Sequence, residues 1–98
     1  MEIENLLYQH PLVTDVAIVA MPDARLGERA CAFVVPAAGA EQLDFASMQR
    51  ALDKAGVSKY YWPERLEYIT ELPRNAVGKV QKNVLREQAA ALVATKEN

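Results

Sequence analysis

Two short runs of β-forming residues constrain the fold more than any other feature of this sequence. They span residues 16–21 and 30–35, and the polar segment 22–28 separates them. Asp15 and Pro22 bound the first run, and Pro36 closes the second, as expected for short strands. Because strands joined by so short a loop pair in opposite directions, we expect an antiparallel β-hairpin.

Three other segments have the apolar spacing of amphipathic helices. The first is short and ends at His10-Pro11, because proline disfavours a helical conformation in the residue before it. The second follows Asp44, a candidate N-cap, and ends at Gly56. The third lies at the C-terminus. The apolar positions that define the helices are Ile3, Leu6 and Leu7; Phe45, Met48 and Leu52; and Leu85, Ala89 and Leu92.

The region between the second and third helices completes the expected fold. Residues 65–70 alternate well enough for a third strand, whereas residues 72–79 lack helical periodicity and contain Pro73 and Gly78, which indicates a loop. The order is helix, strand, strand, helix, strand, helix. It predicts an α+β domain: a small two-layer sandwich in which the antiparallel hairpin and a further strand pack against three helices. With 98 residues, the whole chain (1–98) is expected to be one domain.

Composition excludes several classes of protein. Hydrophobic residues make up 51% and charged residues 24%, which is typical of a globular domain. A net charge of -2 argues against binding nucleic acid by charge. The one cysteine, Cys31, cannot form an internal disulfide, which agrees with a reducing compartment. No apolar run is long enough to span a membrane, and the N-terminus lacks a signal-peptide pattern. We therefore expect a soluble, cytoplasmic protein with no membrane span.

The segment L-P-R-N-A-V-G-K-V-Q-K at residues 72–82 resembles the closing signature of adenylate-forming enzymes, L-P-[RK]-T-x-x-G-K-[IV]-x-[RK]. Asn75 stands where threonine is common, so the hydrogen bonding of this loop is left open. Upstream, E-I-E-N-L-L (2–7), H-P (10–11), V-A-I-V (16–19), P-D (22–23) and G-E (27–28) match the pattern of the same family in order and spacing. The resemblance extends from Glu2 to about Arg86. The chain therefore resembles the C-terminal domain of an acyl-CoA synthetase.

This resemblance implies that Lys79 is the catalytic residue, supported by Pro73 and Gly78 in its loop. In the family, this lysine enters the active site of a larger N-terminal domain and contacts the substrate carboxylate and the ATP phosphates. A long-stemmed cation suits that role because two anions must meet as the acyl-adenylate and pyrophosphate form. Gly78 allows unusual backbone dihedrals. A nucleotide-binding P-loop fails as an alternative, because the slots for its first glycine and its Ser or Thr hold Pro73 and Val80.

The resemblance also implies tentative CoA-binding positions. In the family, the C-terminal domain rotates after adenylation and presents another face to the thiol. The matching positions here are Lys54 and Trp62, where a cation suits the CoA phosphates and a flat aromatic suits adenine or pantetheine. The alternative is a surface lysine and a half-buried core aromatic. Lys82 and Arg86 could steer anionic substrates, although a solvated helix face is the simpler interpretation.

The sequence thus predicts the C-terminal catalytic lid of an ATP-dependent carboxylic acid–CoA ligase, with a place in fatty acid metabolism. Its reagents would be ATP, CoA and a small carboxylic acid. We see no metal site in this chain, and expect an N-terminal adenylate-forming domain in cis to hold Mg²⁺ with the ATP. We expect the chain to be part of this larger enzyme and inert alone. The alternatives are an adenylation domain that feeds a carrier protein, or a free-standing, non-catalytic interaction module.

Overall fold

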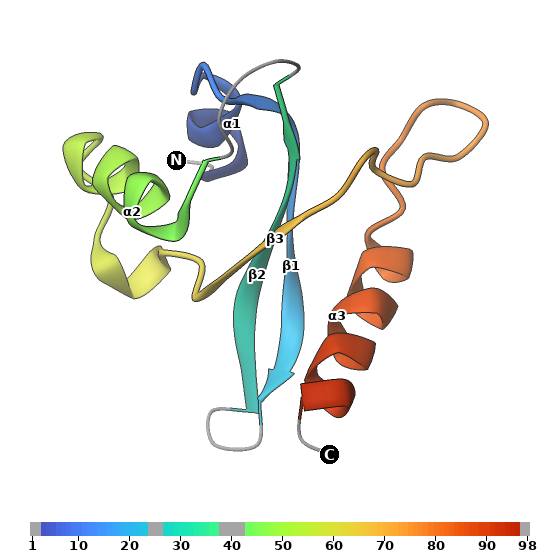
Figure 1. The fold of residues 1–98 in the computed structure, drawn as a ribbon. Helices are drawn as coiled ribbons and strands as arrows, with labels where there is room; N and C mark the ends of the chain where they lie inside the picture. Colours follow the sequence, from blue (N-terminus) through green and yellow to red (C-terminus); the bar gives the residue numbers. More distant parts are fainter. Residues whose placement is uncertain (1–2, 24–26, 38–42, 97–98) are drawn as a thin grey trace.

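The residues that the computed structural model describes (3–23, 27–37 and 43–96) contain one mixed three-stranded sheet (Figure 1). β1 (Val13–Asp23) pairs antiparallel with β2 (Gly27–Pro36), which confirms the hairpin. Both strands extend beyond the runs that predicted them. Four residues expected in the connecting loop therefore belong to strands, and residues 24–26 of that loop lie outside the described ranges.

The third strand runs parallel to its neighbour. β3 (Arg65–Tyr68) pairs with β2, and the sheet order is β1-β2-β3. Parallel pairing requires a crossover connection, which α2 (Phe45–Lys54) and the 3₁₀ helix η1 (Lys59–Tyr61) provide. At the start of α2, the Asp44 carboxylate accepts a hydrogen bond of 2.7 Å from the Ser47 amide, which confirms the predicted N-cap.

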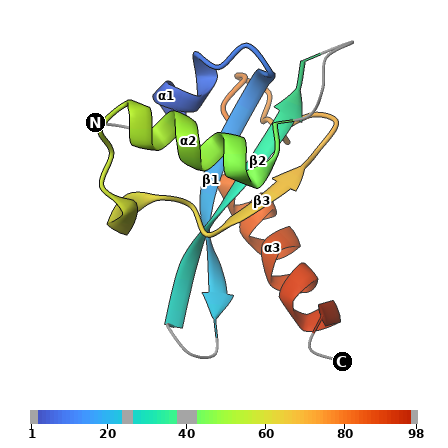
Figure 2. The same cartoon turned by 60° about the vertical axis from the view of Figure 1, so that its left-hand side comes forward.

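The sheet carries helices on both faces, where the sequence led us to expect one helical layer. α1 (Ile3–Tyr8) and α2 lie on one side, and α3 (Lys82–Lys96) lies on the other (Figures 1 and 2). Successive strand residues point to opposite faces, so Val16 and Ala17 enter different cores. The first core contains Leu7, Val13, Val16, Ala32, Val34, Leu43, Met48 and Leu52. The second contains Ala17, Val19, Met21, Cys31, Phe33, Leu72, Leu85 and Ala89. The α+β class with three helices is confirmed among the described residues.

The second core fixes both ends of the segment that carries the adenylation signature. Leu72, the first residue of this segment, is buried, and Leu85 is buried in the first turns of α3 just after it. Between these two anchors, residues 74–79 are exposed. Within the described part of the chain, no helix has the length and apolar character needed to cross a membrane.

Candidate active site

Lys79 lies in a narrow, hairpin-like loop between β3 and α3, seen at the upper right of Figure 1. An isolated antiparallel bridge joins Arg74 and Val80 across the base of the loop. The amide of Gln81 donates to the carbonyl of Pro73 over 2.8 Å, and the amide of Asn75 donates to the carbonyl of Lys79 over 2.9 Å. The loop therefore has a defined backbone, although it has no strand or helix of its own.

Asn75 organises the inside of this loop. Its side-chain oxygen accepts hydrogen bonds from the amides of Val77 (3.1 Å) and Lys79 (3.0 Å), and its backbone carbonyl accepts one from the amide of Gly78 (2.9 Å). Asparagine commonly satisfies nearby backbone amides in turns in this way. The hydrogen bonding that the sequence left open is thus provided by Asn75 itself.

Gly78 is required at its position by backbone conformation. Its φ angle is +88°, in the left-handed region that residues with a Cβ rarely adopt. A Cβ built at this position would meet no atom within 4 Å, so steric crowding within the described residues is not the reason. The unusual dihedral expected from the sequence is present, immediately before Lys79.

The side chain of Lys79 is exposed, and among the described residues its ammonium group forms no ion pair. Its backbone, in contrast, is hydrogen-bonded through both the amide and the carbonyl. The backbone of Lys79 is therefore held in place, while its long cationic side chain extends into solvent. Such an arrangement can bridge two anions brought to it from outside the chain.

A side-chain cluster at the base of the loop was not predicted as part of the site. Arg74 Nη1 donates to the carbonyl of Gly78 over 2.7 Å, and Arg74 Nη2 lies 2.6 Å from Asp15 Oδ2. The hydroxyl of Tyr8 donates to Asp15 Oδ1. The signature includes a basic residue at position 74. Asp15, however, lies 59 residues away in the sequence, and no local pattern marks it.

The ionisation of this cluster follows from its contacts. Burial raises the pKa of Asp15, but hydrogen bonds from Tyr8, Arg74 and the Val16 amide outweigh it and hold the pKa below its ordinary value. The hydrogen bond to Asp15, together with burial, raises the pKa of Tyr8. At neutral pH, Asp15 is therefore a carboxylate and Tyr8 remains protonated.

The cations that begin α3 have different surroundings. Lys82 Nζ lies 2.8 Å from Glu4 Oε2, and the same oxygen accepts a hydrogen bond of 2.6 Å from the Ile18 amide. Lys82 thus joins α3 to α1 and β1. Arg86 is exposed on α3, and we assign it no role.

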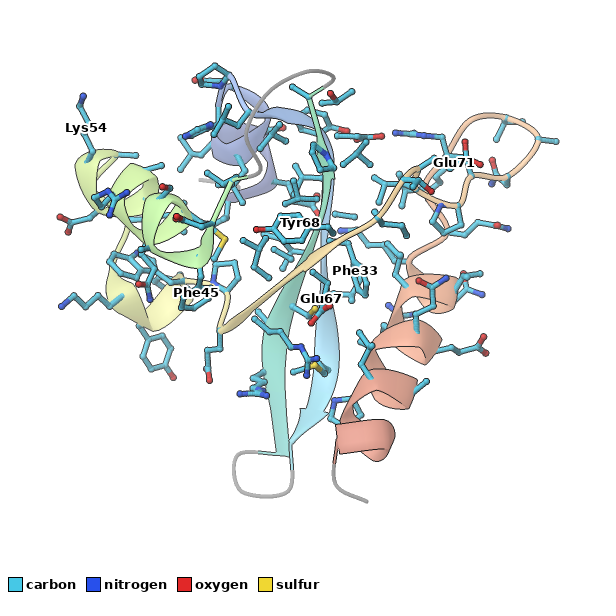
Figure 3. All side chains as sticks on the ribbon, in the orientation of Figure 1. Phe33, Phe45, Lys54, Glu67, Tyr68 and Glu71 are labelled. Atoms are coloured by element: carbon cyan, nitrogen blue, oxygen red, sulfur yellow. The ribbon has the colours of Figure 1, made fainter. Side chains whose placement is uncertain are left out.

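The two tentative CoA positions lie apart from the Lys79 loop. Lys54 is exposed at the end of α2, on the opposite side of the sheet from Glu71, which precedes the loop (Figure 3). Trp62 is half-buried; its indole Nε1 donates to the carbonyl of Val57 over 2.8 Å, and Lys59 Nζ lies 6.0 Å from the ring centre. Lys54 and Trp62 border two different hollows, so the structure does not bring them together in one pocket.

Among the described residues, no group of three or more His, Cys, Asp or Glu side chains lies close enough to hold a metal ion. The buried Cys31 has its pKa raised to about 11, chiefly by burial, so its thiol stays protonated and unreactive at neutral pH.

Comparison with known proteins shows the family to which this chain belongs. Residues 2–79 match the family described as AMP-binding enzyme C-terminal domain, and the chain belongs to that family. It is 44% identical to the medium-chain fatty-acid–CoA ligase of Escherichia coli (strain K12) over 85 residues, which are 87% of this chain and 15% of that protein. It is 43% identical to the 2,3-dihydroxybenzoate-AMP ligase of Bacillus subtilis (strain 168) over 86 residues, 88% of this chain and 16% of that protein.

Solved structures of similar proteins have the same fold as this chain. The crystal structure of ATP-bound MatB from Rhodopseudomonas palustris superposes with a TM-score of 0.79 at 38% identity, covering 88% of this chain and 17% of that one. The apo structure of MbtA from Mycobacterium smegmatis gives 0.78 at 37% identity, covering 88% and 16%. This chain therefore spans about a sixth of the length of the relatives that it matches.

Proposed function

We propose that this chain is the C-terminal catalytic lid of an ATP-dependent carboxylic acid–CoA ligase, in which Lys79 serves acyl-adenylate formation. The observation that carries the proposal is the exposed ammonium of Lys79 on a loop whose backbone is hydrogen-bonded on both sides of it. The chain belongs to a family of C-terminal domains of AMP-binding enzymes, and its relatives include ligases.

The adenylation step makes clear why a cation is needed there. A carboxylate oxygen of the acid attacks the α-phosphorus of ATP, the bond from that phosphorus to the β-bridging oxygen breaks, and pyrophosphate leaves. The carboxylate and the ATP phosphates are both anionic as they approach, and negative charge builds up on the phosphate oxygens during the transfer. The ammonium group of Lys79 would stabilise that charge, and the loop with Gly78 would hold the backbone of Lys79 in place.

The remaining machinery is proposed to lie in an N-terminal domain of the same protein. The relatives are about six times longer than this chain, and no group of side chains that could hold a metal ion lies among the described residues. ATP with its Mg²⁺ and the small carboxylic acid would bind in that domain. By itself the chain would be inert.

The identity of the thiol acceptor has a specific alternative. The medium-chain fatty-acid–CoA ligase among the relatives favours CoA. Lys54 and Trp62 match CoA-binding positions of the family, but they border different hollows, so each would contact CoA separately. Another relative is named for the aryl adenylate that it forms, which favours an enzyme that passes its acyl group to a carrier protein. On our proposal, CoA is the acceptor and the face around the end of α2 contacts it.

Product analysis of the gene product at its natural length tests the proposal. The protein is incubated with ATP and a panel of fatty and aryl acids, first alone, then with CoA or with a phosphopantetheinylated carrier protein. We expect a polypeptide several times longer than 98 residues that forms an acyl-AMP and then an acyl-CoA. Transfer to the carrier alone would establish the alternative. If the native gene product is only 98 residues long and forms no acyl-adenylate, a non-catalytic module would be favoured instead.

A further inference from the structure

We propose that Asp15 is a positioning residue for adenylation, acting through Arg74 on the peptide that carries Lys79; this inference rests on the proposed function. One guanidinium group makes both contacts. Arg74 Nη2 lies 2.6 Å from the carboxylate of Asp15, and Arg74 Nη1 donates to the carbonyl of Gly78 over 2.7 Å. That carbonyl belongs to the peptide unit that continues into the nitrogen of Lys79.

Asp15 is itself held in place from several directions. It lies in β1, whose neighbouring residue Val16 is buried in the first core. Its Oδ1 accepts hydrogen bonds from the hydroxyl of Tyr8 and, over 3.0 Å, from the Val16 amide. Its Oδ2 is thereby directed to Arg74. The Asp15 carboxylate is thus held in place on the sheet, whereas Arg74 lies in an exposed loop.

An irregularity in β1 supports this assignment. The pairing register of β1 with β2 shifts between Val13 and Asp15. As a result, Val13 and Val16, three positions apart, both belong to the first core, which regular alternation would not allow. Such irregularities commonly redirect a side chain. Here Asp15 contacts Arg74, at the base of the loop.

The alternative is that the Arg74–Asp15 ion pair only stabilises the fold. Its exposure to solvent argues against a large contribution of this kind. The side chains of Arg74 and Asp15 are 40% and 17% exposed, and ion pairs this close to solvent contribute little to stability. We therefore expect the ion pair to affect the position of the Lys79 loop more than the free energy of unfolding. A catalytic group displaced by about 1 Å can lose on the order of a hundredfold in rate. Loss of Asp15 would free Arg74 and, through it, the peptide before Lys79.

The two half-reactions of the full-length ligase distinguish these interpretations. Asp15→Asn keeps the size of the side chain and an acceptor oxygen, but removes the charge that orients Arg74. Arg74→Lys keeps the charge, but one ammonium group replaces the two-pronged guanidinium that contacts both Asp15 and Gly78. Glu67→Gln is the matched control, because Glu67 pairs with Arg65 over 2.5 Å on β3, away from the loop.

Each variant is assayed for ATP–pyrophosphate exchange and for thioester formation from pre-formed acyl-adenylate. We expect Asp15→Asn and Arg74→Lys each to lower kcat for exchange roughly 10- to 100-fold, with KM for the acid and thioester formation unchanged. The double variant should be no slower than the slower single variant, because both act through one contact. Glu67→Gln should match the wild type in both assays.

Two results would overturn the inference. One is an Asp15→Asn enzyme with wild-type exchange; the other is an equal loss in both half-reactions, as a folding defect would give. If Asp15→Asn does not fold, Arg74→Lys decides the question by the same criteria. Lys79→Ala, run in parallel, separates the two proposals. If it abolishes exchange while Asp15→Asn does not, the positioning role fails alone, whereas an active Lys79→Ala enzyme contradicts the proposed function itself.

Discussion

The side-chain oxygen of Asn75 accepts a hydrogen bond from the backbone amide of Lys79 over 3.0 Å. The same oxygen accepts a second bond from the amide of Val77, so one side chain satisfies two donors inside the loop. Removing it would leave both amides to water, which changes the shape of the loop more than the stability of the domain, since the residue is exposed.

We therefore expect Asn75→Ala to lower the exchange rate by roughly tenfold, while the free energy of unfolding falls by less than about 1.5 kcal/mol. Asn75→Thr should retain more activity than Asn75→Ala, because a hydroxyl group can also accept a backbone hydrogen bond. Exchange kinetics and urea unfolding of the two variants check this. Equal exchange rates for the alanine and threonine variants would contradict the role of the side-chain oxygen.

Gly78→Ala should separate backbone strain at the site from strain elsewhere. Gly56 is its matched control, because the two glycines have φ angles of +88° and +82° and a Cβ at either would meet nothing within 4 Å. Each substitution should therefore cost about 1–2 kcal/mol of stability. Only Gly78→Ala should also slow exchange, because only Gly78 precedes Lys79. Similar exchange rates in two similarly destabilised variants would show that the loop conformation is not needed.

Asp15 should give a pH dependence of stability with a defined sign. Its pKa in the folded chain lies below the ordinary value of 3.8, so its stabilising contribution is complete above that value and is lost as the pH falls through the folded pKa. The difference in unfolding free energy between the wild type and Asp15→Asn should be constant above about pH 5 and shrink in more acidic solution. Urea unfolding between about pH 2.5 and pH 7 measures it. A difference that grows on acidification would contradict the assignment.

Lys54→Ala should affect only the second half-reaction if CoA binds as proposed. Lys54 is exposed and lies across the sheet from the Lys79 loop, so the unfolding free energy and the exchange rate should not change. Loss of one cation should raise KM for CoA several-fold, in proportion to a charge-assisted contact with phosphate. An unchanged KM for CoA would remove Lys54 from the CoA face.

Much of the fold could be predicted because its signals are local. Asp44 and Gly56 bound α2 through capping and a positive φ angle, both of which depend on residues close in the sequence. The hairpin follows from a short connection between two β-rich runs. The direction of β3 and the division of the helices between the two faces were not predicted, because these depend on how the crossover through α2 packs against the sheet.

The same distinction applies to the site. The motif around Gly78 and Lys79 is contiguous, so the sequence alone could identify the loop. The contact between Arg74 and Asp15 joins residues 59 positions apart, and a register shift in β1 accompanies it; neither has a pattern in one sequence. The tentative assignment of Lys54 and Trp62 to CoA came from the family resemblance, and the structure places them beside different hollows.

A catalytic role for Lys79 is tested most directly by ATP–pyrophosphate exchange with the full-length ligase carrying Lys79→Ala. We expect kcat to fall by about 10²–10³-fold. Thioester formation from pre-formed acyl-adenylate should be unchanged, and Arg86→Gln, which alters an exposed cation on α3, should behave as the wild type. Wild-type exchange by the Lys79→Ala enzyme would contradict the claim that this lysine is catalytic.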